Sequence, residues 1–513
     1  MVTEAIKLLG VSLPYWIAYI WFQGRSRKPA PAPQRQNPFG EAEGVASVCI
    51  ATCTELLEAG RDGSSSWSSA GLDEFNLYRA LKARGVSFHV RSWSDPSVDW
   101  KAYKCVIPRT VWDYSECEAR AFAYSRWLAR VKRGGVKVLN HERIQTWNIH
   151  KAYLKEITEE WDARGGTPGD EWEVASIPSV LVQAGTPSNM INLSSIMAER
   201  GWDEVMIKPA VGGGSKDCFR VLESAGGAGV AAGQAFLLKH ASGAPSIHGS
   251  SSQDARSDSQ PLPSSSRADI LRLGHKPPPP VMSSGDTDAV LSPISSAETV
   301  ERLMQEASIL LHEGSSPQDL ASHPAQDMMM LPYLSSVETQ GELTVVWVAG
   351  AGAVQAVTKV PRPGDYRCQE EFEAVTKGRE LTPQLRQLAS RVLEGALAVV
   401  EKTQPPLDSS TSPSSALSTA ASLPCPLPPD SLLLARIDFL PLTPALHARA
   451  FGKGFKGRRV PLQGRTPLLI LEVELIEPAL FFSEAKASGI PLPDILVGAI
   501  EKVVKAGGAP VAV

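Results

Sequence analysis

The apolar residues between positions 45 and 145 follow two alternating periods. Short apolar runs, typical of buried strands, occupy residues 45–52, 88–93, 104–109 and 136–140. Between them, helical spacing is found over residues 72–84, before Gly85, and over a segment that follows Ser115 and ends at Lys132. Ser115 and Glu118 have the spacing of a helix capping box. This alternation predicts an open, mostly parallel α/β sheet.

The pattern continues, with interruptions, to residue 482. It predicts strands at 205–209, 432–440 and 468–476, and a hairpin that joins 343–349 to 353–360 around Gly350 and Gly352. A helix is expected to start at Thr382-Pro383, and a final amphipathic helix to cover 494–505 and end before Gly507. We therefore expect an α/β domain at 45–145, a larger domain at 146–482 and a C-terminal helical segment at 483–513.

Three stretches inside the larger domain lack this patterning. They cover residues 223–297, 405–430 and 447–464; the first two are rich in Ser, Gly, Pro and Ala, and the third is basic. Such a composition buries too little apolar surface to offset the entropy lost on ordering. We interpret all three as disordered insertions.

The N-terminal segment allows three interpretations. Residues 6–22 are almost wholly apolar, and Arg25, Arg27 and Lys28 follow them. This run is only marginally long enough to span a bilayer, and the basic residues behind it would favour a cytosolic body. It could be a membrane anchor, a cleaved targeting peptide or an amphipathic leader without a membrane role. Residues 1–44 together are interpreted as an apolar leader and a Pro-rich linker.

Charge and cysteine content narrow the functional classes. The 513 residues carry a formal net charge of −4 without a dominant basic block, so we do not expect a nucleic-acid partner. The seven cysteines are widely spaced and form no CxxC motif, which argues against a zinc site and a disulfide framework. A reducing compartment, cytoplasmic or organellar, is expected. The oligomeric state is not indicated.

The last two predicted strands carry charged residues among apolar ones. Arg436 and Asp438 share one face of their strand, and Glu472 and Glu474 share one face of the next, because strand side chains alternate with a period of two. A buried carboxylate is costly unless it is paired or ligates a metal. Three carboxylates on two strands therefore predict a site for one or two Mg²⁺ ions.

Two other segments have a composition suited to phosphate. Lys208 ends a predicted strand, and Gly212, Gly213 and Gly214 follow, where backbone N–H groups can approach phosphate oxygens. This is not a P-loop, because the GxxxxGK[ST] pattern is absent. Lys359, Arg362 and Arg367 cluster at the end of the predicted hairpin and could bind a phosphate or a carboxylate.

Taken in order, these segments resemble motifs of the ATP-grasp superfamily, in particular of the branch with bacterial glutathione synthetase and the cyclo-ligase of cycloserine biosynthesis. Residues 147–154 resemble the first ATP-lysine segment, and Ile207-Lys208-Pro209 with the glycine loop resembles the second. Leu331 to Leu334, with Glu338 and Gly341-Glu342, resembles the nucleotide hinge. Arg436-x-Asp438 and Glu472-x-Glu474, with Pro478, resemble the metal strands. Arg109 to Tyr114 resembles a strand-end motif of the preceding α/β domain.

This resemblance implies a two-lobed ATP-grasp domain behind an open α/β domain. It also implies that ATP and Mg²⁺ activate a small-molecule carboxylate as an acyl phosphate, which an amine then attacks. The implied roles are as follows: Lys151, Lys208, Gly212, Gly213 and Gly214 for phosphates; Leu331, Tyr333, Leu334, Glu338 and Glu342 for adenosine; Asp438, Glu472 and Glu474 for Mg²⁺; Arg436 and Arg367 for catalysis; Arg109, Lys359 and Arg362 for substrate.

The chain departs from the family pattern at four places. Leu331 replaces the usual hinge glutamine and Glu474 the usual metal-strand asparagine. Thr344 replaces an arginine of glutathione synthetases, which argues against glutathione as the product. The Gly-Gly expected after Arg367 is absent from residues 370–374. A non-catalytic nucleotide-binding or interaction protein, and a phosphotransferase on the same fold, therefore remain as alternatives.

Overall fold

The computed structural model describes residues 39–62, 69–163, 174–221, 226–242, 325–403, 426–428, 430–451 and 468–506. Its N-terminal sheet has the order β2-β1-β3-β4 with all neighbours parallel. The strands are β1 (Val48–Thr52), β2 (Phe88–Ser92), β3 (Cys105–Pro108) and β4 (Lys137–Val138). The helices α3 (Thr54–Asp62), α4 (Ser69–Ala83) and α5 (Glu118–Arg133) accompany them. The predicted parallel α/β sheet is confirmed.

Two local predictions in this domain are wrong. Ser115 is not a helix cap: it lies in the 3₁₀ turn Trp112–Glu116, its hydroxyl donates to the Trp112 carbonyl at 2.8 Å, and Cys117 precedes α5 without a side-chain cap bond. The strand predicted at 136–140 is shortened to two residues because Asn140 turns toward the next sheet. Its amide donates to the carbonyls of Leu434 and Leu475, each at 2.7 Å. These bonds tie the N-terminal domain to the site-bearing strands.

The largest sheet has six strands in the order β12-β11-β10-β13-β14-β5. They are β5 (Val174–Ser176), β10 (Glu342–Val348), β11 (Gly352–Val360), β12 (Val375–Arg379), β13 (Leu434–Pro441) and β14 (Leu468–Glu474). The hairpin β10–β11 confirms the prediction, and Gly350 and Gly352 supply its turn with φ near +75°. Helices α7 (Tyr153–Ala163) and α12 (Pro383–Thr403) pack on this sheet, and Thr382 caps α12 as predicted. Ile437 and Phe439 belong to the resulting core, which leaves Arg436 and Asp438 on the opposite face.

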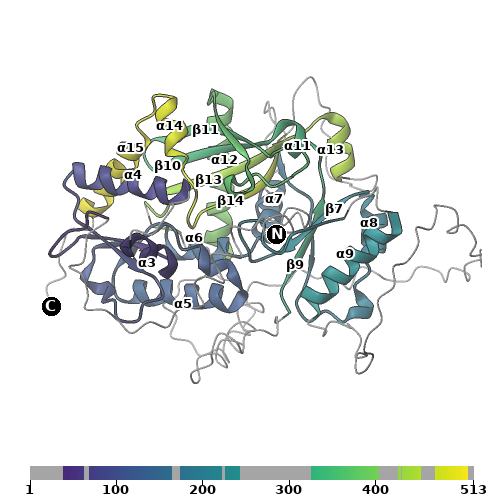
Figure 1. Ribbon diagram of the computed structural model, residues 1–513, viewed down its shortest axis with the longest axis horizontal. Helices are drawn as coiled ribbons and strands as arrows, with labels where there is room; N and C mark the ends of the chain where they lie inside the picture. Colours follow the sequence, from purple (N-terminus) through teal and green to yellow (C-terminus); the bar gives the residue numbers. More distant parts are fainter. Residues whose placement is uncertain are drawn as a thin grey trace, which may run out of the picture.

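A smaller lobe contains a four-stranded sheet in the order β6-β9-β7-β8. Its strands are β6 (Val180–Val182), β7 (Val205–Pro209), β8 (Phe219–Val221) and β9 (Met328–Pro332), accompanied by α8 (Leu193–Arg200) and α9 (Gly226–Ala241). Figure 1 shows α8 and α9 side by side at one end of the molecule. The interpretation of all of 223–297 as disordered is wrong over α9, where Leu237 and Ala241 are fully buried against the lobe's core. The apolar Ala-Phe-Leu-Leu run within α9 is flanked by the glycines and serines that dominated the composition.

The C-terminal helices return to the start of the chain. Figure 1 shows α14 (Phe482–Ala487) and α15 (Leu492–Ala506) beside α4, and the contacts agree. Leu492, Leu496 and Ile500 share one core with β1, β2 and β10. The remaining helices are α6 (Glu142–Asn148), α11 (Ser336–Gln340) and α13 (Pro444–Phe451); α13 overlaps the start of the third predicted insertion.

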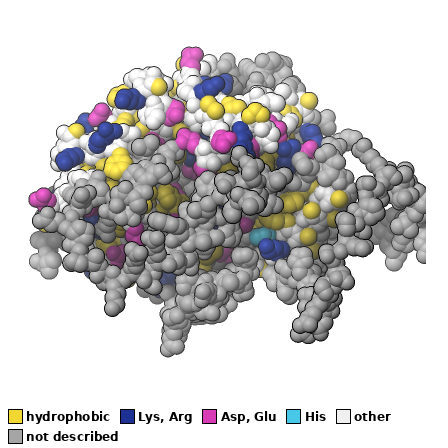
Figure 2. Space-filling view, viewed as in Figure 1, with side chains coloured by type: hydrophobic (Ala, Val, Ile, Leu, Met, Phe, Trp, Pro, Cys, Tyr) yellow, Lys and Arg dark blue, Asp and Glu magenta, His cyan; other side chains and the backbone are white. Residues whose placement is uncertain are grey.

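Several predictions fall outside the described residues. These are residues 1–38 of the leader and linker predicted at 1–44, Gly507 and most of the three insertions. Within the described part, no helix has the length and hydropathy needed to cross a membrane, and the six described cysteines are free thiols. Figure 2 shows basic and acidic side chains interspersed over the upper part of the visible face.

Candidate functional site

Three carboxylates converge on the face of the large sheet opposite α12. Strands β13 and β14 are antiparallel, and before the register shift that follows Asp438, Arg436 lies opposite Glu474 and Asp438 opposite Glu472. One oxygen from each of Asp438, Glu472 and Glu474 lies within 4.8 Å of the others. In an octahedral Mg²⁺ site with bonds of about 2.1 Å, opposite ligand oxygens are about 4.2 Å apart. The oxygen-only donor set and its spacing therefore fit Mg²⁺ after small side-chain adjustments.

Arg436 and Lys359 compensate the negative charge of this cluster. The Arg436 guanidinium donates to Asp438 Oδ2 at 2.8 Å and to Glu474 Oε1 at 2.5 Å. The Lys359 ammonium lies 2.7 Å from Glu342 Oε2 and 3.4 Å from Asp438 Oδ2. Burial disfavours the charged form of Asp438, but the positive charges of Arg436 and Lys359 outweigh this effect and hold the pKa of Asp438 at about 2. Burial raises the pKa of Glu474 to about 7 despite Arg436, with Glu472 and Asp438 adding to the rise.

The charge of Glu472 acts on two lysines, one in the connection before α7 and one on the smaller lobe. Lys151 lies 3.2 Å from Glu472 Oε1 and donates to the Gly212 carbonyl at 2.6 Å. Lys208 lies on β7, where burial lowers its pKa, Lys151 lowers it further, and Glu472 opposes the change. Of the two predicted ATP lysines, Lys151 therefore contacts Glu472 directly, and Lys208 is influenced by the charge of the same carboxylate.

The glycine loop faces a second loop that follows the hairpin. Gly214 has φ +57° and is followed by Ser215, also in the left-handed region, whose hydroxyl is 3.0 Å from Gln369 Oε1. A Cβ on Gly213 would come within 3.2 Å of Ser115 Oγ. The glycines therefore allow the loop to pass close to the N-terminal domain on one side and to residues 369–371 on the other.

The predicted hinge adjoins this site. Leu331, Tyr333 and Leu334 are buried, and Leu331 pairs with Met206 on β7. The Tyr333 amide donates to the Glu204 carbonyl at 2.9 Å, and its hydroxyl donates to Glu338. Glu342 differs from the other hinge residues, because it pairs with Lys359 and so belongs to the carboxylate cluster.

The three remaining predicted arginines are placed differently. Arg109 is 3% exposed and donates to Glu74 at 2.7 and 2.9 Å and to the Pro478 carbonyl at 2.9 Å, so it joins the N-terminal domain to the end of β14. This buried pairing does not fit the predicted substrate contact. Arg367 is held by Asp365 at 2.7 and 2.9 Å and stacks on Phe372, whereas Arg362 is 48% exposed and pairs with Glu373.

Three further residues at the site are not among the predicted site residues. Thr344 donates to Asp438 Oδ1 at 2.5 Å and is fully buried. The Glu477 carboxyl lies near Glu474 and Arg109; burial raises its pKa well above the usual range, with Glu474 adding to the rise. Arg220, on β8, contacts the hinge through Tyr333 and Glu338. Glu477 comes directly before Pro478 of the motif that resembles a metal strand, but nothing in the local sequence distinguishes Arg220.

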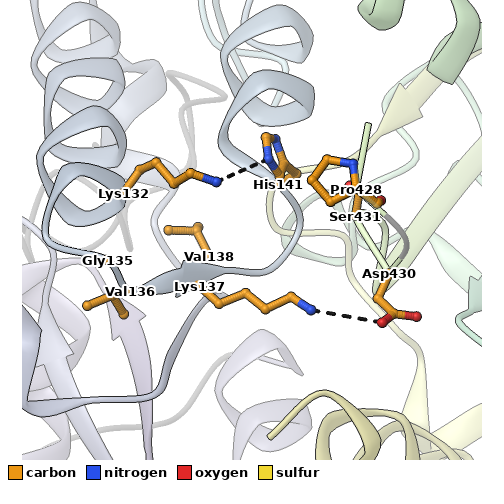
Figure 3. A pocket seen from close by; sticks show the side chains of 9 residues that line it. All are labelled: Lys132, Gly135, Val136, Lys137, Val138, His141, Pro428, Asp430 and Ser431. Atoms are coloured by element: carbon orange, nitrogen blue, oxygen red, sulfur yellow. Dashed lines mark hydrogen bonds and ion pairs between the residues drawn. The ribbon is translucent and has the colours of Figure 1, made fainter. Parts of the chain in front are cut away.

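A separate cavity of about 270 Å³ lies at the junction of α5, β4 and the segment before β13. Figure 3 shows Lys132 directed toward His141 and Lys137 toward Asp430 across it. The Lys132 ammonium also lies 3.6 Å from Glu142, and burial lowers the pKa of His141 to about 4 with Lys132 and Arg143 adding to the effect. Its charges are matched in separate pairs, and none of the predicted site residues lines it. We therefore take the carboxylate cluster as the candidate active site.

Comparisons with known proteins relate this chain to one group of enzymes. Residues 48–140 match the family model for the N-terminal domain of the D-cycloserine synthetase DcsG. The chain is 26% identical over 148 residues to the cycloserine biosynthesis protein DcsG of Streptomyces lavendulae; the match spans 29% of this chain and 44% of that protein, less than half of its length.

The solved structures that resemble this chain have lower sequence identities than the match just described. The crystal structure of D-cycloserine synthetase DcsG has a TM-score of 0.48 at 16% identity, covering 89% of this chain and 99% of that one. The D-alanyl-alanine synthetase A of Vibrio cholerae has a TM-score of 0.41 at 11% identity, covering 90% and 99%. Both TM-scores are below 0.5.

Proposed function

We propose that the chain has an ATP-grasp fold, like the D-cycloserine synthetase DcsG to which it is similar, and that it is an ATP- and Mg²⁺-dependent carboxylate–amine ligase. The observation that carries the proposal is the convergence of three carboxylates with Arg436, Lys359 and Lys151 on one sheet face. Mg²⁺ held by Asp438, Glu472 and Glu474 would neutralise phosphate charge and fix the orientation of the terminal phosphate.

The lysines bind the phosphates in this proposal. Lys151 exchanges Glu472 for phosphate oxygens, which leaves the Glu472 carboxylate available to the metal, and Lys208 adds a second positive charge for the phosphates. The backbone of Gly212 to Gly214 approaches the same phosphates, and the hinge from Leu331 to Glu338 holds the adenosine. Without nucleotide, the ion pairs described above keep the site close to neutral, so its charges are compensated in both states.

The reaction then proceeds by positioning and charge stabilisation. A substrate carboxylate oxygen attacks the γ-phosphorus, the bond to the β-phosphate breaks, and ADP and an acyl phosphate result. An amine attacks the acyl carbon and displaces phosphate, and its proton passes to solvent. Arg436 stabilises the tetrahedral oxyanion. Arg367, once released from Asp365, steadies the transferring phosphoryl group, and the exposed Arg362 attracts the substrate carboxylate.

The first test is calorimetric titration of the full chain with ATP, with and without Mg²⁺, followed by measurement of ADP release with panels of carboxylates and amines. A ligase binds ATP in a Mg²⁺-dependent manner and releases ADP with consumption of an amine. ADP release with a stable phosphorylated product would indicate a phosphotransferase instead, and binding without turnover a nucleotide-binding protein. A folded chain that does not bind ATP would refute the proposal.

A further inference from the structure

Arg220 connects the smaller lobe to the hinge through its contacts with three side chains. On β8 it pairs with Met206 of β7, which pairs in turn with Leu331 of β9, so the three residues form one row across the sheet. The guanidinium carbon lies 3.5 Å from the centre of the Tyr333 ring. Its edges donate to Glu204 Oε2 at 2.9 Å and to Glu338 Oε1 at 2.9 Å.

The carboxylate of Glu338 is held through one of its two oxygens. Both Arg220 and the Tyr333 hydroxyl donate to Oε1. Among the described residues no bond is made to Oε2, and the side chain is 32% exposed. A carboxylate accepts up to four hydrogen bonds, so Oε2 keeps its full accepting capacity and has a fixed orientation.

We propose that Arg220 is a positioning residue that orients Glu338 so that its second oxygen accepts from the ribose hydroxyls of the nucleotide. This inference rests on the proposed nucleotide site, in which the hinge holds the adenosine. It makes the preference for a sugar with hydroxyl groups depend on a residue of the neighbouring lobe. Because Glu338 is anionic, its bond to a hydroxyl is of the stronger, charge-assisted kind.

Arginine suits this position better than lysine. The planar guanidinium stacks on Tyr333 with its face while its edges bind two carboxylates, Glu204 and Glu338. An ammonium is a point charge and cannot do both at once with fixed geometry. A purely structural role of Arg220 would lower stability or the affinity for every nucleotide equally. A positioning role changes only the part of the affinity that depends on the sugar hydroxyls.

The test compares ATP with 2′,3′-dideoxy-ATP, each with Mg²⁺, by calorimetry on the full chain. Wild type should bind the dideoxy nucleotide roughly 10- to 100-fold more weakly, the range expected for a hydrogen bond to a charged group. Arg220→Met should lose ATP affinity yet bind dideoxy-ATP as wild type does. The ratio of the dissociation constants for dideoxy-ATP and ATP should therefore fall to less than about threefold. Arg220→Lys should give an intermediate ratio, and Glu338→Gln should give the same small ratio as Arg220→Met.

Arg84→Met is the matched control. Arg84 donates two hydrogen bonds of 3.0 Å to Glu501 in the contact of α4 with α15, so its loss removes a comparable ion pair away from the hinge. It should keep the wild-type ratio. Arg220→Met with the wild-type ratio, or a wild type that binds both nucleotides equally, would overturn the inference. A wild type that binds neither nucleotide would instead overturn the proposed function beneath it.

Discussion

The carboxylate cluster of β13 and β14 and the cavity around Lys132 and His141 contain similar groups in different arrangements. Both hold lysines close to buried carboxylates. In the cluster, Arg436 and Lys359 share Asp438, and Arg436 also reaches Glu474. At the cavity, Lys132 pairs with Glu142, which does not line it, and Lys137 pairs separately with Asp430. Figure 3 shows the second pair.

The difference shows that a cavity by itself is a weaker indication of function than several charged side chains that converge on one point. Of the described residues, the cluster is the one place where three possible metal ligands come within 4.8 Å of one another. Like charges held close together cost free energy, which a bound cation recovers. Ion pairs that are already matched one to one have no such repulsion for a bound cation to relieve. Four predictions test this comparison.

The largest effect is expected for Glu472→Gln. The amide keeps the shape but removes a ligand charge and the partner of Lys151, so Mg²⁺-dependent ATP affinity should fall at least about 100-fold, close to 2.7 kcal/mol. Calorimetry with ATP and Mg²⁺ measures this. Glu142→Gln makes the same change beside the cavity, where the carboxylate lies 3.6 Å from the Lys132 ammonium, and should leave ATP affinity unchanged. Equal losses in the two variants would contradict the comparison.

The second prediction concerns the pH dependence of stability that His141, beside the cavity, should produce. His141 has a folded pKa of about 4, below the ordinary value of 6.5, so the unfolded chain binds more protons between these values. Stability should therefore decrease as pH falls from 6.5 to 4, by on the order of 2 kcal/mol. His141→Asn keeps an N-cap acceptor for Arg143 and should reduce this decrease. Urea unfolding of both proteins at pH 7.5 and 4.5 measures this loss of stability. If wild type and variant lose the same free energy of unfolding, His141 is not responsible.

A smaller effect is expected for Thr344→Val, which removes the hydrogen bond to Asp438 without changing the volume of the side chain much. Loss of a group that orients a metal ligand typically costs about 10-fold in metal affinity. We expect this loss in a titration with Mg²⁺ at saturating ATP. Thr344→Ser, which keeps the hydroxyl, should stay near wild type, and an equal loss in both variants would refute the orienting role.

The smallest effect is expected for Lys137→Ala. Its ion pair with Asp430 is 4.0 Å long, and the carboxylate is 58% exposed. Exposed pairs of this kind contribute about 0–1 kcal/mol, so neither the urea midpoint nor ATP affinity should change measurably. A clear loss of ATP affinity would mean that the cavity belongs to the nucleotide site.

Much of the fold and of the site could be predicted because the governing signals are local. Strand periodicity placed Arg436 with Asp438 and Glu472 with Glu474, and the structure confirms both pairs. Apolar runs alternating with helical segments predicted that the strands of the first sheet are parallel, and glycines predicted the β10–β11 hairpin. The prediction for α9 failed because a short apolar run was averaged with its Gly- and Ser-rich surroundings.

By itself, then, the sequence determined which residues share a strand face, because alternation along a strand is a property of the backbone. Only the tertiary structure decided which partners meet on that face. The register that sets Asp438 opposite Glu472, the pairing of Arg109 with Glu74 and the contact of Arg220 with Glu338 join residues 34 to 118 positions apart. Their pairing depends on how sheets and lobes pack, and no local pattern encodes it.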